Sequence, residues 1–160
     1  MLRTATLDDL TTVASWITSP RDSELWAGWR VRFPIDLATL PVCILFSEQH
    51  AYAWVVDGQM VAFGQLVLKP GGRKHLATII VNPALRRRGH GEAIVGALLA
   101  QAGAQCPIIS LNVDEQNLAA ISLYQRLGFV DAPRPPDEPL SRGSRYMIRH
   151  GTGQDSRSDR

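Results

Sequence analysis

The chain has 160 residues, of which 45% are hydrophobic and 20% charged, a balance that suits one compact globular domain. Its net charge of +2 is too small to argue for nucleic acid binding, and no run approaches the roughly 20 apolar residues of a membrane span. The N-terminal residues contain no apolar run of signal length, and the two cysteines have neither metal nor disulfide-framework spacing, so we expect a cytoplasmic protein without a metal.

The first third of the chain predicts one strand and two helices. Residues 3–7 are predicted as a short strand, and the apolar residues that follow recur at helical spacing as far as Ile17. Ser19 and Pro20 are typical of a helix N-cap and a first helical position, so a second helix is expected there. One more short turn is expected over residues 35–40.

The middle of the chain is rich in strand signals. Apolar runs at 51–56 and 60–68 are joined by an Asp-Gly pair, which predicts a β-hairpin. A third run, 75–81, ends at an Asn-Pro pair, and a loop with three arginines leads from it into a helix over 89–102.

The last third repeats the alternation of strand and helix. A strand is predicted over 108–113 and a helix over 118–127, ended by a glycine, after which another strand begins. Four prolines over 132–139 predict an extended loop before a final strand at 144–148. These elements together predict an α/β domain with many antiparallel hairpins.

The domain organisation follows from the distribution of apolar residues. They extend to about residue 150, so a single domain is expected over 1–150. Residues 151–160 are polar and lack apolar residues, which favours a disordered tail.

The junction between strand 75–81 and the following helix predicts an anion site. A helix start presents unpaired N–H groups and the positive end of the helix dipole. Gly89 and Gly91 allow a ligand to approach the backbone, and the arginines at 86–88 add charge that suits phosphate. The alternative is a solvated basic loop before an ordinary helix; neither a P-loop nor a dinucleotide fingerprint is present.

Two blocks of residues resemble the GNAT superfamily of N-acetyltransferases. The run 81–91 contains Arg-x-x-Gly-x-Gly and is similar to the acyl-CoA signature of the superfamily. The run 117–129 is similar to its N-x-x-A-I-x-L-Y-x-x-x-G-F block. Because the two patterns occur in the expected order and on the expected elements, they are more specific together than either is alone. The resemblance is good over residues 50–131, whereas the N-terminal third matches only in outline.

The resemblance implies a fold and a cofactor site. The expected fold is a GNAT-like mixed, mostly antiparallel twisted sheet flanked by helices, with a splayed central strand pair at 75–81 and 108–113. Acetyl-CoA, the implied co-substrate, would place its acyl arm in the gap between those two strands. The residues expected to bind it are Ile79, Ile80, Val81, Arg86, Arg87, Arg88, Gly89, His90, Gly91, Glu92 and Asn117.

The implied reaction is direct attack of a primary amine on the thioester of acetyl-CoA. Backbone N–H groups near Ile80 and Val81 would stabilise the oxyanion. The resemblance places Tyr124 beside the sulfur, where a phenol with an ordinary pKa near 10 could donate a proton to the leaving thiolate. The alternative for Tyr124 is an aromatic ring packed on a helix face.

The general base is where the sequence departs from known branches of the superfamily. The two positions at which those branches carry a glutamate are occupied by Asn112 and His75. An imidazole could accept the proton directly or through water, so His75 is a candidate base, although a surface role is the simpler interpretation. Asp114 or Glu115 are alternatives, as is transfer with no dedicated base.

The acceptor pocket is expected near the N-terminal helices. In the superfamily such a pocket is lined by the first two helices and the late strands, which here gives Trp26, Trp29, Arg30 and Phe33, with Tyr146 as a further candidate. Aromatic walls suit an apolar or a cationic group, although tryptophans at helical spacing also suit a hydrophobic core. The few acids nearby argue against a polycationic acceptor.

Two other functions remain open at this point: a non-catalytic acyl-CoA-binding sensor or regulatory module, and transfer of a longer acyl chain. The acceptor amine, the acyl chain length and the base are not determined by the sequence. The resemblance adds a homodimer as one expectation for the oligomeric state.

Overall fold

The computed structural model describes residues 1–139 and 141–152, so most of the predicted disordered tail lies outside the described residues. The strands are β1 (Leu2–Thr4), β2 (Ala51–Val56), β3 (Gln59–Leu68), β4 (Lys74–Val81), β5 (Ile108–Asp114), β6 (Val130–Asp131) and β7 (Ser144–His150). The helices are α1 (Asp9–Ser15), α2 (Pro20–Ala27), α3 (Leu40–Cys43), α4 (His90–Ala102) and α5 (Leu118–Arg126). None of the helices in these residues has the length and apolarity that crossing a membrane requires.

The predicted elements are present with small shifts at their ends. Ser19 accepts a hydrogen bond from the backbone N–H of Asp22 at 3.1 Å, so it caps α2 as expected. The first strand ends at Thr4 rather than at residue 7, because the carboxylate of Asp9 accepts a hydrogen bond from the Thr6 N–H and turns the chain into α1. The short turn expected at 35–40 is present over residues 37–39, and α3 follows it directly.

The strands form one seven-stranded sheet in the order β1-β2-β3-β4-β5-β7-β6. Neighbouring strands are antiparallel except β4 and β5, which are parallel. These two strands pair only where Lys74–Leu76 face Ile109–Leu111, and their remaining residues are not paired with each other. The prediction of a mixed sheet with a splayed central pair is therefore confirmed.

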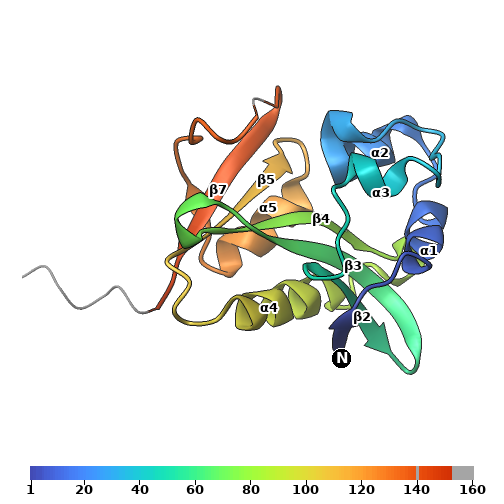
Figure 1. The fold of residues 1–160 in the computed structure, drawn as a ribbon, viewed down its shortest axis with the longest axis horizontal. Helices are drawn as coiled ribbons and strands as arrows, with labels where there is room; N and C mark the ends of the chain where they lie inside the picture. Colours follow the sequence, from blue (N-terminus) through green and yellow to red (C-terminus); the bar gives the residue numbers. More distant parts are fainter. Residues whose placement is uncertain (140, 153–160) are drawn as a thin grey trace, which may run out of the picture.

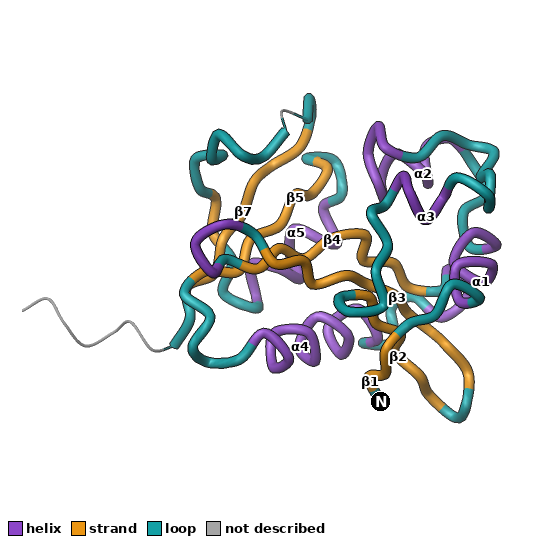
Figure 2. Tube along the Cα trace, viewed as in Figure 1, coloured by secondary structure: helices purple, strands orange, loops and turns teal. Residues whose placement is uncertain are grey.

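Helices cover both faces of the sheet. One apolar cluster joins α4 and α5 to the sheet and includes Ile94, Leu98 and Tyr124. A second cluster joins α1, α2 and α3 to the opposite face, where Phe63 and Ile80 meet them. In Figure 1, α2 and α3 lie on one side of the upper part of the molecule and β5, β7 and α5 on the other, with α4 below. The trace in Figure 2 shows the same arrangement, with the sheet between the helices.

A β-bulge interrupts β4 at the point where it separates from β5. The pairing of β3 with β4 passes from Phe63–Ile80 to Gln65–Ala77, so that Thr78 and Ile79 together face Gly64. Thr78 has a φ of 52°, which is rare for a β-branched residue. A Cβ atom on Gly64 would lie 2.4 Å from Cδ1 of Ile79, so the bulge depends on a residue without a side chain at this position.

Candidate active site

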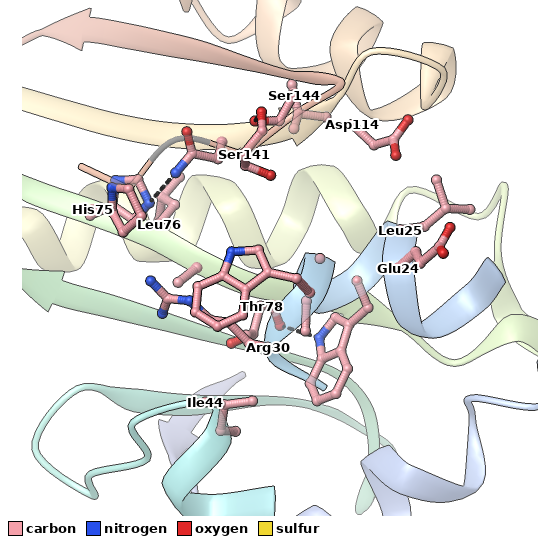
Figure 3. Close-up of a pocket in the computed structure, with 18 of the residues that line it drawn as sticks. Glu24, Leu25, Arg30, Ile44, His75, Leu76, Thr78, Asp114, Ser141 and Ser144 are labelled. Carbon is pink, nitrogen blue, oxygen red and sulfur yellow. Dashed lines mark hydrogen bonds between the residues drawn. The ribbon is translucent and has the colours of Figure 1, made fainter. Parts of the chain in front are cut away.

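A cleft of about 640 Å³ opens between α2 with its following turn and the splayed part of the sheet. Strand β3 supplies Gln65 and Val67 to its lining, Lys69 follows directly after that strand, and β4 supplies the run from His75 to Thr78. Figure 3 shows Arg30 and Thr78 in the middle of the cleft, His75 at one end, and Glu24 and Asp114 at the other. The bulge of β4 thus places its backbone beside the cavity.

Three of the four residues predicted for the acceptor pocket line this cleft: Trp26, Trp29 and Arg30. Trp26 is buried, and its indole N–H donates to the backbone oxygen of Thr78 at 2.9 Å. Trp29 is 67% exposed, and the Arg30 guanidinium lies 5.9 Å from its ring centroid. Phe33 is 37% exposed and is not among the described residues that line the cleft. Tyr146, the further candidate, is buried and does not line the cleft; its hydroxyl accepts a hydrogen bond from Arg73 at 2.7 Å.

His75 is buried at the end of the cleft, contrary to the surface interpretation. Its Nδ1 lies 2.8 Å from Oγ of Ser110, and its Nε2 lies 3.4 Å from Nδ2 of Asn112. The Arg134 guanidinium donates to Oδ1 of Asn112, which fixes the orientation of that amide. The amide N–H therefore points at Nε2 of His75, so Nε2 carries a lone pair and Nδ1 carries the proton.

The environment of His75 keeps it neutral. Burial in the sheet is the main cause, and it lowers the pKa of the imidazole to about 4; Glu138 opposes this shift, whereas Lys69, Arg73 and Arg30 add to it. The imidazole of His75 is therefore neutral near pH 7, with its one proton on Nδ1.

Glu138 is a cleft residue that the sequence analysis missed. Its side chain is 2% exposed, and Oε1 lies 3.3 Å from Nζ of Lys69 and 3.2 Å from Nη1 of Arg73. Burial alone would raise the pKa of this carboxyl, but the positive charges around it lower the pKa overall. Glu138 reaches the cleft from the proline-rich stretch, and no local pattern in that stretch indicates the contact.

The other two candidate bases lie at the opposite end of the cleft. Asp114 accepts a hydrogen bond from the Gln116 N–H at 2.8 Å and pairs with Arg21 at 3.3 Å, so it is engaged in a turn and an ion pair. Glu115 is exposed and also lines the cleft. Residues 1–139 and 141–152 contain no group of three or more His, Cys, Asp or Glu side chains placed to hold a metal.

The predicted anion site lies at the start of α4. Gly89 has a φ of +82° and precedes the helix, and its carbonyl accepts the helix's first hydrogen bond, from the Ala93 N–H at 3.0 Å. The backbone N–H groups of residues 86–92 donate to no other group in the described part of the chain. The side chains of Arg86, Arg87 and Arg88 are exposed and form no ion pair within it. Glu92 pairs with Arg126 at 3.9 Å on the surface.

This corner has features that favour the binding of an anion. Free N–H groups at the end of a 13-residue helix meet a left-handed glycine and three unpaired guanidinium groups. His90 and Gly91 form the first turn, and a Cβ atom on Gly91 would lie 3.4 Å from Leu123.

The remaining predicted residues lie on α5 and at the end of β4, and Ile80 among them faces the α1–α3 cluster. Tyr124 is buried against Phe129, with ring centroids 5.8 Å apart, and burial raises the pKa of its hydroxyl to about 12. Asn117 begins α5, and its side-chain oxygen accepts from the Ala120 N–H at 3.3 Å. Ile80 and Val81 pair with β3 on one side, and neither pairs with β5 on the other.

Comparison with known proteins identifies the family. The model of the Acetyltransferase (GNAT) family matches residues 11–129, which is most of the chain. The chain belongs to this GNAT family. It is therefore an N-acetyltransferase by family, and the prediction of an acyl-transferring enzyme is confirmed. Membership in an enzyme family favours that prediction over a non-catalytic module.

Solved structures of GNAT proteins share the fold over almost the whole chain. The ribosomal-protein-S18-alanine N-acetyltransferase from Escherichia coli is 24% identical, with a TM-score of 0.68 and 97% of each chain covered. The spermidine N-acetyltransferase from Vibrio cholerae, in complex with CoA and spermine, is 16% identical, with a TM-score of 0.71 and coverage of 94% of this chain and 95% of that one. A Mycobacterium tuberculosis protein in complex with CoA and NLQ is 20% identical, with a TM-score of 0.67 and coverage of 94% and 98%.

Proposed function

We propose that this GNAT enzyme transfers the acetyl group of acetyl-CoA to a primary amine of a small molecule, an amino acid or a peptide. The observation that carries the proposal is the set of free backbone N–H groups at residues 86–92, located at one end of the gap between β4 and β5. The cleft lined by Trp26 and Arg30 borders the same splayed strands. The acetyl donor and the amine that accepts the acetyl group could therefore meet where β4 is unpaired.

The cofactor site proposed for acetyl-CoA follows from this chain's own residues. The diphosphate would accept hydrogen bonds from the N–H groups between Arg86 and Glu92, with the arginine side chains nearby. The acyl arm would lie along Ile79, Ile80 and Val81. Asn117 would contribute its side-chain N–H groups, which remain available because only its oxygen is used to cap α5.

Tyr124 is proposed to assist departure of the thiolate. When bound, acetyl-CoA supplies a thioester whose sulfur leaves with a negative charge. Because the pKa of Tyr124 is about 12, the phenol is fully protonated at neutral pH and can donate to that sulfur. Backbone N–H groups near Ile80 and Val81 are proposed to hold the carbonyl oxygen as it gains charge.

His75 is proposed as the proton acceptor, directly or through water. Its lone pair on Nε2 is set by the contact with Asn112, and the ring borders the cleft. With a pKa of about 4 the imidazole is neutral but a weak base, and proton uptake at Nε2 requires the long contact with Asn112 to open, so its contribution to the rate should be modest. Transfer without a dedicated base is the competing route, and a His75→Gln variant with unchanged turnover would favour it.

The acceptor class is inferred from the charges and rings of the cleft. Charged lining residues are balanced between four acidic and four basic side chains: Glu24, Asp114, Glu115, Glu138, Arg21, Arg30, Lys69 and Arg142. A balanced lining gives no net attraction for a polycation. The exposed ring of Trp29 offers an apolar wall, which favours a monoamine with an apolar or aromatic group.

A thiol-release assay tests the proposal. The purified chain would be incubated with acetyl-CoA and each of phenethylamine, L-phenylalaninamide, glycinamide, spermidine and an Ala-initiated tetrapeptide. We expect release above background with at least one monoamine and the least with spermidine. Butyryl-CoA in the same assay tests the longer acyl chain. Tight CoA binding by calorimetry without thiol release for any amine would favour the sensor alternative and contradict the proposal.

A further inference from the structure

Two buried polar atoms lack a hydrogen-bond partner, and both belong to residues that line the cleft. They are Oε1 of Gln65 and Oγ1 of Thr78, and no other buried side-chain nitrogen or oxygen in the described residues is left unpaired. Buried polar groups in folded proteins are nearly always paired, and an unpaired one is costly. That both exceptions fall in the same cleft indicates that a ligand supplies the missing partners.

The orientation of the Gln65 amide is fixed by its other contact. Its Nε2 donates to the backbone oxygen of Ile44 at 2.9 Å, and that oxygen can only accept. The unpaired atom of Gln65 is therefore the oxygen, a pure acceptor, on a residue that is 1% exposed. Its missing partner must be a hydrogen-bond donor.

Thr78 lies beside Gln65 at the bulge. Gln65 on β3 faces Ala77 on β4, and Thr78 is the next residue along β4. The left-handed backbone of Thr78, with a φ of 52°, is held in place by the hydrogen bond from Trp26 to its carbonyl. Its hydroxyl can accept one hydrogen bond as well as donate one. The two unpaired oxygens thus belong to residues of neighbouring strands that line the same cleft.

We propose that Oε1 of Gln65 and Oγ1 of Thr78 bind the two N–H groups of the acceptor's neutral primary amine. This inference rests on the proposed function, which requires an amine in the cleft. A neutral primary amine carries two N–H donors and one lone pair. With both donors bound to the cleft floor, the lone pair is left free for the carbonyl carbon of the thioester. A secondary amine has one donor only, so the subsite selects primary amines.

The shielding of the two oxygens defines how the amine reaches them. Both oxygens have almost no solvent-accessible surface in this structure, so the surrounding side chains must shift before an amine N–H can reach them. Once there, the amine meets no competing solvent, and its hydrogen bonds are stronger than they would be at a surface.

Replacement of Thr78 by valine separates this role from a structural one. Thr78→Val keeps the β-branched shape and removes an unpaired hydroxyl, so the melting temperature should stay the same or rise. The KM for the best amine of the assay panel should rise about 3- to 10-fold, the loss expected for one hydrogen bond between neutral groups. The KM for acetyl-CoA should not change. Thr78→Ser retains the hydroxyl and should recover most of the acceptor affinity.

The selectivity for primary amines gives a second readout. With the wild-type enzyme, the N-methyl derivative of the best amine should have a kcat/KM at least about 10-fold lower, and the double variant Gln65→Met, Thr78→Val should lose most of that preference. If wild type acetylates an amine but Thr78→Val leaves both its acceptor KM and its preference unchanged, the subsite is wrong while the proposed function stands. A wild-type enzyme inactive toward the whole panel would instead remove the proposed function, and this inference with it.

Discussion

The indole N–H of Trp26 donates a hydrogen bond to the backbone oxygen of Thr78, 2.9 Å away, and so joins α2 to the bulge of β4. This contact links the N-terminal helices, which form one wall of the cleft, to the strand that borders the gap between β4 and β5. Because the two residues are 52 positions apart, the cleft is held open by long-range packing rather than by a local motif.

Loss of that hydrogen bond should destabilise the fold and loosen the cleft. Trp26→Phe keeps a ring but leaves the Thr78 oxygen without its donor, so we expect the free energy of unfolding to fall by about 1–3 kcal/mol. Trp29→Phe is the matched control, because Trp29 is 67% exposed and should cost less than about 0.5 kcal/mol. Urea denaturation of both variants measures the difference, and equal losses would contradict the argument.

The left-handed glycine at the start of α4 should matter for the cofactor. Gly89→Ala has open space for its methyl group but strains a φ of +82°, at a cost of roughly 1 kcal/mol. Relaxation of that strain would turn the free N–H groups away from the diphosphate, so the KM for acetyl-CoA should rise several-fold. Gly58→Ala is the control, because Gly58 also has open space and a φ of +75° but lies in the β2–β3 turn. If both variants shift the KM for acetyl-CoA equally, the cradle is placed wrongly.

The fold was predictable because its signals are local. The Asp-Gly turn, the cap at Ser19 and the apolar runs each act over a few residues, so strands and helices could be placed before their neighbours were known. The predicted anion site is also contiguous in sequence, from Val81 through Gly91. The family resemblance then supplied the splayed pair, which no periodicity indicates.

The residues that line the cleft, and their contacts, were only partly predictable because their positions depend on strand register and on segments distant in the sequence. Glu138 meets Arg73 across 65 positions, and nothing in the proline-rich stretch predicts that contact. Asn112 was considered only as a residue that cannot take a proton, yet its amide determines the tautomer of His75. The orientation that leaves the oxygen of Gln65 unpaired depends on the contact of its Nε2 with the carbonyl of Ile44, 21 positions away.

Tyr124 should be required for turnover rather than for stability. Tyr124→Phe preserves the edge-to-face ring contact with Phe129 and removes a hydroxyl that bonds to no other group in the described residues. We expect kcat to fall by about 100-fold or more, the size of effect typical of a general acid, with little change in the affinity for CoA. Because the pKa of Tyr124 is about 12, kcat of the wild type should not decline through loss of this proton below about pH 11. Unchanged turnover in stopped-flow thiol release would refute the role as donor.

His75 should make the fold sensitive to acid. Its pKa is lowered to about 4 in the folded state from an ordinary value of 6.5, so between these pH values the unfolded chain binds the proton more readily. Stability is therefore fully present above pH 6.5 and falls as the pH drops toward 4, by up to about 3 kcal/mol. Glu138, Lys69, Arg73 and Arg30 are the charged groups that act on this imidazole, and Glu138 itself loses stabilising charge only below its usual pKa of 4.5.

His75→Gln isolates the contribution of His75 to the pH dependence of the free energy of unfolding. The variant cannot take up the proton, so its free energy of unfolding should decline much less than that of the wild type between pH 6.5 and 4.5. His150→Gln, at the exposed end of β7, is the control and should retain the wild-type dependence. Urea denaturation at half-unit pH intervals gives the two slopes. Parallel slopes for wild type and His75→Gln would show that the buried imidazole is not the group that titrates, and would remove the basis for a neutral His75 beside the acceptor.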